Sequence, residues 1–237
     1  MESMNLWHNV PGKCEETPKI TAYIPNDKKS DTAVVILPGG EYGGRAEHEG
    51  KDYAEFLNKN GITAFVVDYR VSPHRFPLPL LDSRRAIQWV RHFANEYGIN
   101  KNKVLIMGSS TGGHLAALTS TYFEEITDFD IKDEISKESF IQNGQILCYP
   151  VINLAGKIGD VHFGSGMNLL GEKYAELSYS LTPANITSQK NPPAFIWHTF
   201  EDSILAVLHQ QKLCRLWNLE LQQLNSSLQM YMVDYLL

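Results

Sequence analysis

The sequence is poor in cysteine, and the few cysteines it has show no pairing pattern. Cys14, Cys148 and Cys214 are the only three in 237 residues. Their odd number and wide spacing match neither the disulfide framework of a small secreted domain nor a CxxC metal motif. We therefore expect reduced thiols, a cytoplasmic protein and no metal site.

Long apolar runs and clusters of basic residues are also missing. No segment approaches the ~20 apolar residues that span a bilayer. The first residues have no basic region followed by an apolar core, as a signal peptide would. The formal net charge is -6, whereas affinity for nucleic acid comes largely from Lys and Arg that neutralise phosphates. We expect neither a membrane nor a nucleic-acid partner; the oligomeric state stays open, with a homodimer as one alternative.

The composition is that of an ordinary globular protein. Hydrophobic residues make up 43% and charged residues 20% of the chain, which is enough apolar material for a substantial core. A chain of this length suits one large domain better than two small ones, and no linker or internal repeat divides it. We predict a single domain over residues 1–237.

Apolar, β-branched runs alternate with amphipathic segments of helical length, a pattern typical of an α/β fold with a mostly parallel sheet. The predicted strands are residues 20–24, 33–37, 62–67, 103–107, 145–149, 194–198 and 228–233. Helices are predicted over 47–59, 80–97 and 114–122, with Tyr53, Phe56 and Leu57 on one apolar face of the first. The acidic segment 124–138 is predicted as a solvated surface connection, with a small lid as the alternative.

The segment Gly108-Ser109-Ser110-Thr111-Gly112 fits the pattern G-x-S-x-G between a strand and a helix. A nucleophile at such a turn adopts strained backbone angles, and small residues two positions before and after it relieve the crowding. The turn directs the Thr111 amide toward a developing oxyanion. The alternative is a glycine- and serine-rich turn without chemistry. Ser109 is one residue off the central position, so Ser110 is the predicted nucleophile.

A second glycine-rich loop, Pro38-Gly39-Gly40-Glu41-Tyr42-Gly43-Gly44, follows the strand predicted over 33–37. Such a loop lets backbone N–H groups approach a substrate oxygen without obstruction by side chains. By itself this signal is weak, because glycine-rich turns after strands are common.

Taken together, six segments resemble the bacterial acetylesterase/carboxylesterase branch of the α/β-hydrolases, which includes xylan acetylesterase-like and "sugar hydrolase" members. The segments are the loop at 38–42 (HGGGY or PGGGY in the family), 68–73 (DYRLSP), 77–91 (P-x-P…D-x-x-R-A-x-x-W-x-R), 108–116 (GxSxGGHLA), 181–184 (SP-x-x) and 192–199 (PPxFxxH). The resemblance extends from about residue 20 to about residue 208. It implies an α/β-hydrolase fold, a three-layer sandwich with helices on both faces of the sheet.

The resemblance also implies site residues. Ser110 is the implied nucleophile, and the backbone amides of Gly40, Glu41 and Thr111 are the implied oxyanion hole. Glu41 departs from the usual glycine, so its carboxylate has to point away from the oxyanion. Asp202, in the HTxxD-like segment, is the implied acid of the triad; the alternatives are a helix cap at Asp202 or Glu201 as the acid.

The implied activity is the hydrolysis of short-chain esters, plausibly acetyl groups on sugars, without a cofactor. The expected partner is therefore a small-molecule ester. Tyr42 and Tyr69 are candidates for lining the substrate pocket, with a core role as the alternative. A peptidase or lipase on the same fold is a further alternative.

The catalytic histidine that the resemblance requires after Asp202 is missing. No histidine follows His209, which lies only seven residues beyond Asp202. His114 and His198 fall in family motifs that do not supply the base, and we interpret both as structural or pocket-lining. We expect residues 209–237 to be an atypical ending, truncated or frame-altered, and the rival hypothesis is an impaired hydrolase that binds acylated sugars or small esters.

Overall fold

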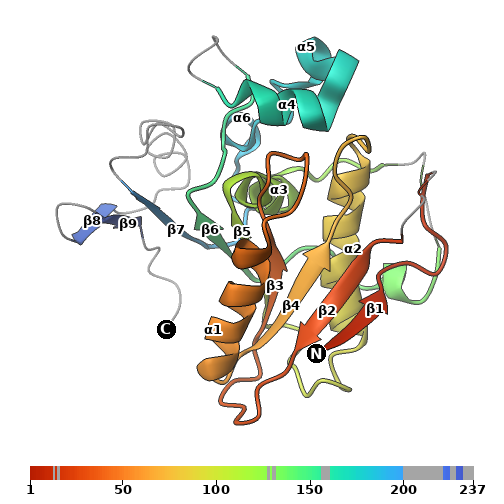
Figure 1. Cartoon of the computed structure of the whole chain (residues 1–237), viewed down its shortest axis with the longest axis vertical. Coiled ribbons are helices and arrows are strands. Elements are labelled where there is room, and N and C mark those ends of the chain that lie inside the picture. The colour runs from red at the N-terminus through yellow and green to blue at the C-terminus, as the bar shows by residue number, and fades with distance from the viewer. Residues whose placement is uncertain are drawn as a thin grey trace.

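The computed structural model describes residues 1–12, 14, 17–126, 129, 132–155, 161–199, 221–224 and 228–231. Within these ranges the chain forms a nine-stranded sheet in the order β1-β2-β4-β3-β5-β6-β7-β9-β8 (Figure 1). The strands are β1 (Glu2–Asn5), β2 (Lys19–Tyr23), β3 (Ala33–Leu37), β4 (Thr63–Asp68), β5 (Val104–Ser109), β6 (Gly144–Cys148), β7 (Ala194–Thr199), β8 (Leu221–Leu224) and β9 (Leu228–Tyr231).

The centre of the sheet is parallel and its edges are antiparallel. The strands β4, β3, β5, β6 and β7 pair in parallel, while β1 and β2 on one edge and β9 and β8 on the other pair antiparallel. Strands β3 and β4 are almost wholly buried, as expected where helices cover both faces. The predicted mostly parallel sheet is confirmed.

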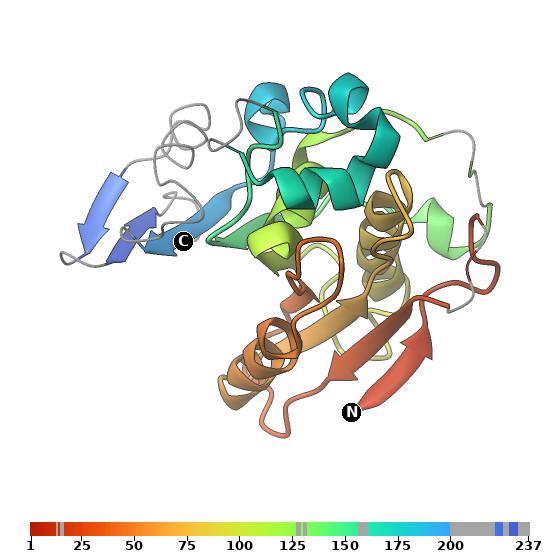
Figure 2. The same cartoon turned by 45° about the horizontal axis from the view of Figure 1, so that its top comes forward.

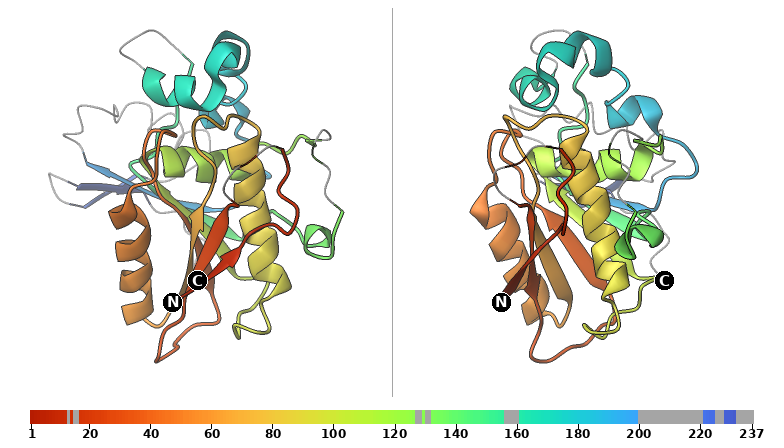
Figure 3. Two further views of the ribbon diagram at one scale, coloured as in Figure 1. Left: turned by 45° about the vertical axis from the view of Figure 1, so that its right-hand side comes forward. Right: turned by 90° about the vertical axis from the view of Figure 1, so that its right-hand side faces the viewer.

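Helices cover both faces of this sheet. They are α1 (Tyr53–Lys59), which follows a π-helical turn (His48–Asp52), α2 (Leu78–His92), α3 (Ser110–Thr121), α4 (Phe163–Leu170), α5 (Tyr174–Leu177) and α6 (Pro183–Ile186); short 3₁₀ turns lie at Ile135–Lys137 and Gly171–Lys173. Figure 3 shows α1 on one side of the sheet and α2 on the other. Among the described residues, none of the helices combines the length and hydrophobicity that a bilayer crossing requires.

Alternation along the strands divides the core into two parts. Val34 and Ile36 of β3 belong to the cluster with Ala54 of α1. Val35 and Leu37 belong to the larger cluster with α2 and α3. Successive side chains of a strand point to opposite faces, so one five-residue strand supplies both hydrophobic layers. This confirms the three-layer arrangement.

The buried face of α1 differs from the prediction. Ala54 is fully buried and Tyr53 and Leu57 are partly buried, but Phe56 is 64% exposed. Residues 53, 54 and 57 lie on one side of a helix with 3.6 residues per turn, and position 56 lies off that side. Placing Phe56 with Tyr53 and Leu57 was therefore wrong.

The acidic segment packs against α2. Asp133 forms an ion pair of 2.5 Å with Arg85, and Ile135 is 6% exposed next to that helix. This cover contributes to the burial of Arg85, which is 1% exposed. The described part of the segment is thus a connection against α2, as the first alternative predicted.

Figure 2 shows that α4, α5 and α6 lie together above the ends of the central strands, close to the start of α3. The segment 209–237 is described only at β8 and β9, the second within the predicted strand 228–233. The expectation about its origin stays a prediction.

Candidate active site

Ser110 lies at a sharp bend between β5 and α3. It is the first residue of α3 and adopts φ 51, in the left-handed region. A serine in this region is strained, and such strain persists where the surrounding structure enforces it. Ser110 is partly exposed, whereas its neighbour Ser109 is fully buried. The bend thus presents the hydroxyl of Ser110 rather than that of Ser109.

Glycines make room for this bend. A Cβ on Gly108 would lie 2.1 Å from the carbonyl oxygen of Gly112, and a Cβ on Gly112 would lie 2.0 Å from the carbonyl oxygen of Leu37. Both distances are far below contact distance, so no other residue fits without movement of the backbone. The two outer glycines of the G-x-S-x-G pattern therefore have a direct steric reason.

The glycine-rich loop after β3 lies against this bend. The amide of Gly40 donates to Thr111 Oγ1 at 3.1 Å, which brings the loop to the residue after Ser110. The Thr111 amide, at the second position of α3, has no acceptor within its own helix. Among the described residues the Glu41 amide has no hydrogen-bond partner either. The structure thus brings Gly40, Glu41 and Thr111 near Ser110, with the Gly40 amide already bonded to a side chain.

The side chain of Glu41 is directed toward α4. Its carboxylate lies 3.9 Å from His162 Nε2, and its carbonyl oxygen accepts from Asn168 Nδ2 at 2.9 Å. His162 Nδ1 in turn lies 2.6 Å from Ser165 Oγ. These contacts give the carboxylate a position outside the oxyanion pocket, as the presence of Glu41 in this loop requires.

Tyr42 anchors the loop from inside the protein. It is 0% exposed, and its hydroxyl lies 2.7 Å from His114 Nδ1. His114 Nε2 lies 2.9 Å from the carbonyl oxygen of Leu181, which is only an acceptor, so Nε2 carries the proton and Nδ1 accepts from Tyr42. Burial lowers the pKa of His114 to about 4, and the imidazole is neutral at pH 7.

Tyr69, the residue directly after β4, supports the same loop. It is 0% exposed, and its hydroxyl donates to the carbonyl oxygen of Pro38 at 2.6 Å. Burial raises the pKa of both Tyr42 and Tyr69, so both phenols stay protonated and act as donors. These positions favour the core alternative for the two tyrosines over direct contact with substrate.

A buried ion pair stabilises the chain that follows Tyr69. The Arg70 guanidinium binds both carboxylate oxygens of Asp82, at 2.8 and 2.7 Å. Asp82 also accepts from the Arg70 amide and from Trp7 Nε1. Ser72, two residues on, donates its amide to the carbonyl oxygen of Tyr42. Asp82 therefore acts on the loop through Arg70.

One buried carboxylate beside the loop has no signal in the sequence. Glu49 is 7% exposed; its Oε2 accepts from the Gly39 amide at 2.7 Å and its Oε1 from the Tyr149 hydroxyl at 2.8 Å. A glutamate in the first turn of a helix is ordinarily a solvent-exposed residue that interacts with the helix dipole. No signal in the sequence separates Glu49 from its exposed neighbour Glu47.

The structure does not describe the candidates for the acid and the base of the expected triad. Asp202, Glu201 and His209 lie outside the described residues. Within the described part of the chain no imidazole is hydrogen-bonded to Ser110; His114 binds Tyr42, as above, and His198 is buried in β7. The roles assigned to Ser110 and Asp202 stay predictions.

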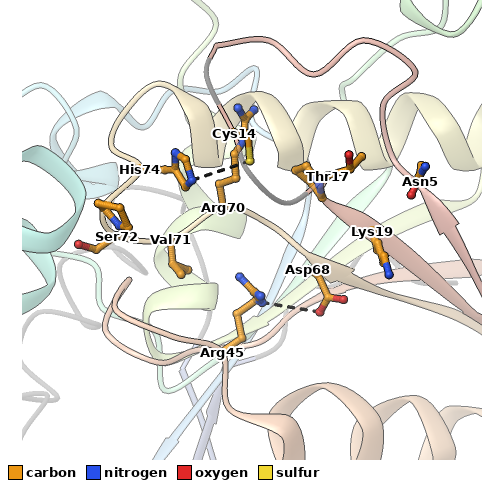
Figure 4. A pocket seen from close by; sticks show the side chains of 12 residues that line it. Asn5, Cys14, Thr17, Lys19, Arg45, Asp68, Arg70, Val71, Ser72 and His74 are labelled. Carbon is orange, nitrogen blue, oxygen red and sulfur yellow. Dashed lines mark hydrogen bonds and ion pairs between the residues drawn. The ribbon is translucent and has the colours of Figure 1, made fainter.

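A cavity of about 930 Å³ lies beside the chain that follows Tyr69. The residues that line it include Arg45, Asp68, Arg70, Ser72 and His74. Figure 4 shows the Arg45 side chain pointing toward Asp68. Ser110 does not line this cavity.

The bend at Ser110 and the loop after β3 can bind and polarise a carbonyl oxygen next to a serine hydroxyl, which is the arrangement that acyl transfer requires.

Comparison with known proteins gives the family. The BD-FAE family matches residues 20–216. The chain is 34% identical to Endo-1,4-beta-xylanase B of Butyrivibrio fibrisolvens over 86% of its own length and 33% of that protein. It is 32% identical to Acetylxylan esterase of Xylanibacter ruminicola over 80% of its own length and 37% of that protein. The chain thus spans about a third of the length of these two curated relatives.

Solved structures give the same fold. An acetyl ester-xyloside bifunctional hydrolase from Caldicellulosiruptor lactoaceticus superposes with a TM-score of 0.83 at 36% identity, covering 92% of this chain and 81% of that one. Thermogutta terrifontis esterase 2 phosphoramylated by tabun superposes with a TM-score of 0.71 at 25% identity, covering 92% and 78%. The resemblance to esterases of the α/β-hydrolase fold is confirmed, and the chain belongs to the BD-FAE family of α/β-hydrolases.

Proposed function

We propose that this chain is a serine esterase that hydrolyses short-chain carboxylic esters, acetyl esters of sugars in particular. The observation that carries the proposal is the left-handed bend at Ser110, with the loop after β3 bonded across to Thr111. It presents a hydroxyl beside amides that have no acceptor of their own. The esterases among the relatives and structural neighbours support ester hydrolysis as the class of reaction.

In this reaction Ser110 Oγ attacks the ester carbonyl, and the new bond to carbon places negative charge on the carbonyl oxygen. The amides of Glu41 and Thr111 stabilise that charge, together with Gly40 when its amide is released from Thr111 Oγ1. The bond to the alcohol then breaks, and the alcohol leaves with a proton. Water hydrolyses the acyl-enzyme and regenerates Ser110.

Removal of the Ser110 proton needs a general base, because a serine hydroxyl is a weak nucleophile at its ordinary pKa. Asp202 is the proposed acid that would orient such a base. An enzyme of this type that lacks one triad member retains only the catalysis that its oxyanion hole and binding supply. The rate of this chain therefore depends on which group takes the proton.

Acetylated xylan fragments are the proposed natural substrates. The basis is that the relatives include an acetylxylan esterase and a xylanase, and that one structural neighbour is an acetyl ester-xyloside hydrolase. The exposed carboxylate of Glu41 in the loop lies next to His162. These polar groups can form hydrogen bonds with the hydroxyl groups of a sugar.

The test compares wild type, Ser110→Ala and Ser109→Ala with p-nitrophenyl acetate, followed by acetylated xylo-oligosaccharides. Labelling by a fluorophosphonate is located by peptide mass spectrometry. We expect hydrolysis and labelling in wild type and S109A and neither in S110A. Equal rates in wild type and S110A would refute the proposal.

A second arm adds free imidazole, which acts as an external base. If imidazole raises the rate of wild type and leaves S110A unchanged, Ser110 is the nucleophile and the chain lacks an efficient base of its own. Labelling of Ser110 without turnover, even with imidazole, would instead identify an impaired hydrolase that binds esters.

A further inference from the structure

Glu49 is a buried carboxylate that touches both loops flanking Ser110. It lies in the π-helical turn His48–Asp52, and its two oxygens accept hydrogen bonds from different segments. Oε2 accepts from the amide of Gly39 in the loop after β3. Oε1 accepts from the hydroxyl of Tyr149, which directly follows β6. The Tyr149 loop also reaches Ser110, because the amide of Val151 donates to the Ser110 carbonyl oxygen at 2.9 Å.

The carboxylate lies close to the nucleophile. A Cβ built on Gly39 would lie 2.4 Å from Glu49 Oε2 and 3.0 Å from the Cβ of Ser110. The carboxylate oxygen and Ser110 thus both border the space that a side chain at Gly39 would fill. A change in the orientation of the Gly39 peptide would be passed directly to Gly40 and Glu41.

Burying the Glu49 carboxylate costs free energy unless hydrogen bonds or an ion pair compensate for the lost hydration. Within the described part of the chain no Lys, Arg or His forms an ion pair with Glu49, although removing a carboxylate from water costs several kcal/mol. Among the residues that the structure describes, its hydrogen bonds come from Gly39 and Tyr149, and Tyr149 itself adopts φ 36 in the left-handed region. Burial, with the hydrogen bonds to Tyr53 and Glu49, raises the pKa of Tyr149, which keeps its hydroxyl a donor.

We propose that Glu49 is a positioning residue for the oxyanion hole, which it holds in place through the Gly39 amide and the Tyr149 hydroxyl. The inference rests on the proposed esterase function. With Gly39 N–H bound to the carboxylate, the Gly39 peptide cannot rotate without losing a charge-assisted hydrogen bond. The following turn therefore keeps the Glu41 amide free of intramolecular acceptors.

The experiment compares Glu49→Ala, Glu49→Gln and Tyr149→Phe, with Glu47→Ala as the matched control on an exposed glutamate two residues earlier. In E49Q the amide oxygen accepts from Gly39 and the amide nitrogen donates to the Tyr149 oxygen, so both contacts survive. In E49A both donors lose their acceptor. Thermal unfolding of each variant shows whether it is folded at the assay temperature.

We expect E49A to lower kcat for p-nitrophenyl acetate about 10- to 100-fold. This loss is smaller than the loss of about 10²- to 10³-fold that follows removal of an oxyanion donor. KM should change less than about twofold. E49Q keeps kcat within about fivefold of wild type, Y149F lies between E49Q and E49A, and E47A equals wild type. The rate of fluorophosphonate labelling falls in the same order, because the phosphoryl oxygen occupies the same hole.

A kcat for folded E49A within twofold of wild type would overturn the inference, as would a rise in KM alone. Hydrogen exchange of peptides covering residues 38–44 gives a readout that does not depend on chemistry. Faster exchange in E49A and wild-type exchange in E49Q support positioning; equal exchange in all variants overturns it. If wild type is neither labelled nor active, the proposed function fails while this measurement still decides the role of Glu49 in the loop.

Discussion

We expect acid to destabilise this protein through His114. Its imidazole is fully buried between Tyr42 and the carbonyl oxygen of Leu181. No carboxylate of the described residues contacts it, and a proton on Nδ1 would face the Tyr42 hydroxyl that now donates to it. Burial therefore lowers the pKa of His114 to about 4 from its ordinary value of 6.5.

The sign and size follow from this difference. Because the folded-state pKa is the lower one, the unfolded chain binds the proton first as the pH falls through 6.5, and stability is lost until the pH reaches about 4. Between pH 7 and pH 5 the loss from this one group is about 2 kcal/mol. For a chain of this size that corresponds to about 4–8 °C in Tm.

The assay is urea or thermal unfolding of wild type, His114→Gln and the exposed His92→Gln at pH 7 and pH 5. Glutamine does not titrate, so the stability of H114Q should change less between the two pH values than that of wild type, by about 2 kcal/mol. H92Q should behave as wild type. The same pH dependence in wild type and H114Q would refute the reasoning.

Three further predictions concern packing, charge and strain near the site. Gly112→Ala should abolish activity and lower Tm, because its Cβ would lie 2.0 Å from the Leu37 carbonyl oxygen; an active, stable variant would contradict this. Asp82→Ala should destabilise by about 3–5 kcal/mol in urea unfolding, because it leaves the buried Arg70 guanidinium without its carboxylate; a loss below about 1 kcal/mol would contradict it. Glu41→Gly should raise stability by less than about 1 kcal/mol, because relief of the left-handed strain at φ 57 gains about 1–2 kcal/mol and the greater freedom of glycine in the unfolded chain offsets about 0.5–1 kcal/mol of it; a lower Tm would contradict this.

The local features of this protein could be predicted from the sequence. Strands such as β3 need only a short run of β-branched residues, and the bend at Ser110 needs only glycines two positions away on each side. Both depend on neighbours along the chain, so their residue pattern is enough to identify them. The family resemblance added the α/β-hydrolase fold and the implied oxyanion role of the loop after β3, whereas the order of the strands in the sheet came from the structure.

What surrounds the bend was decided only by the tertiary structure. Tyr42 and His114 are 72 residues apart, and Glu49 and Tyr149 are 100 residues apart. Each pair meets because distant segments converge at the carboxyl ends of the parallel strands, and neither glutamate nor tyrosine carries a local mark of that meeting. For the same reason the sequence leaves Tyr42 open between a pocket role and a core role and gives no sign that Glu49 is buried, since burial is a property of the packed chain rather than of a residue and its neighbours in sequence.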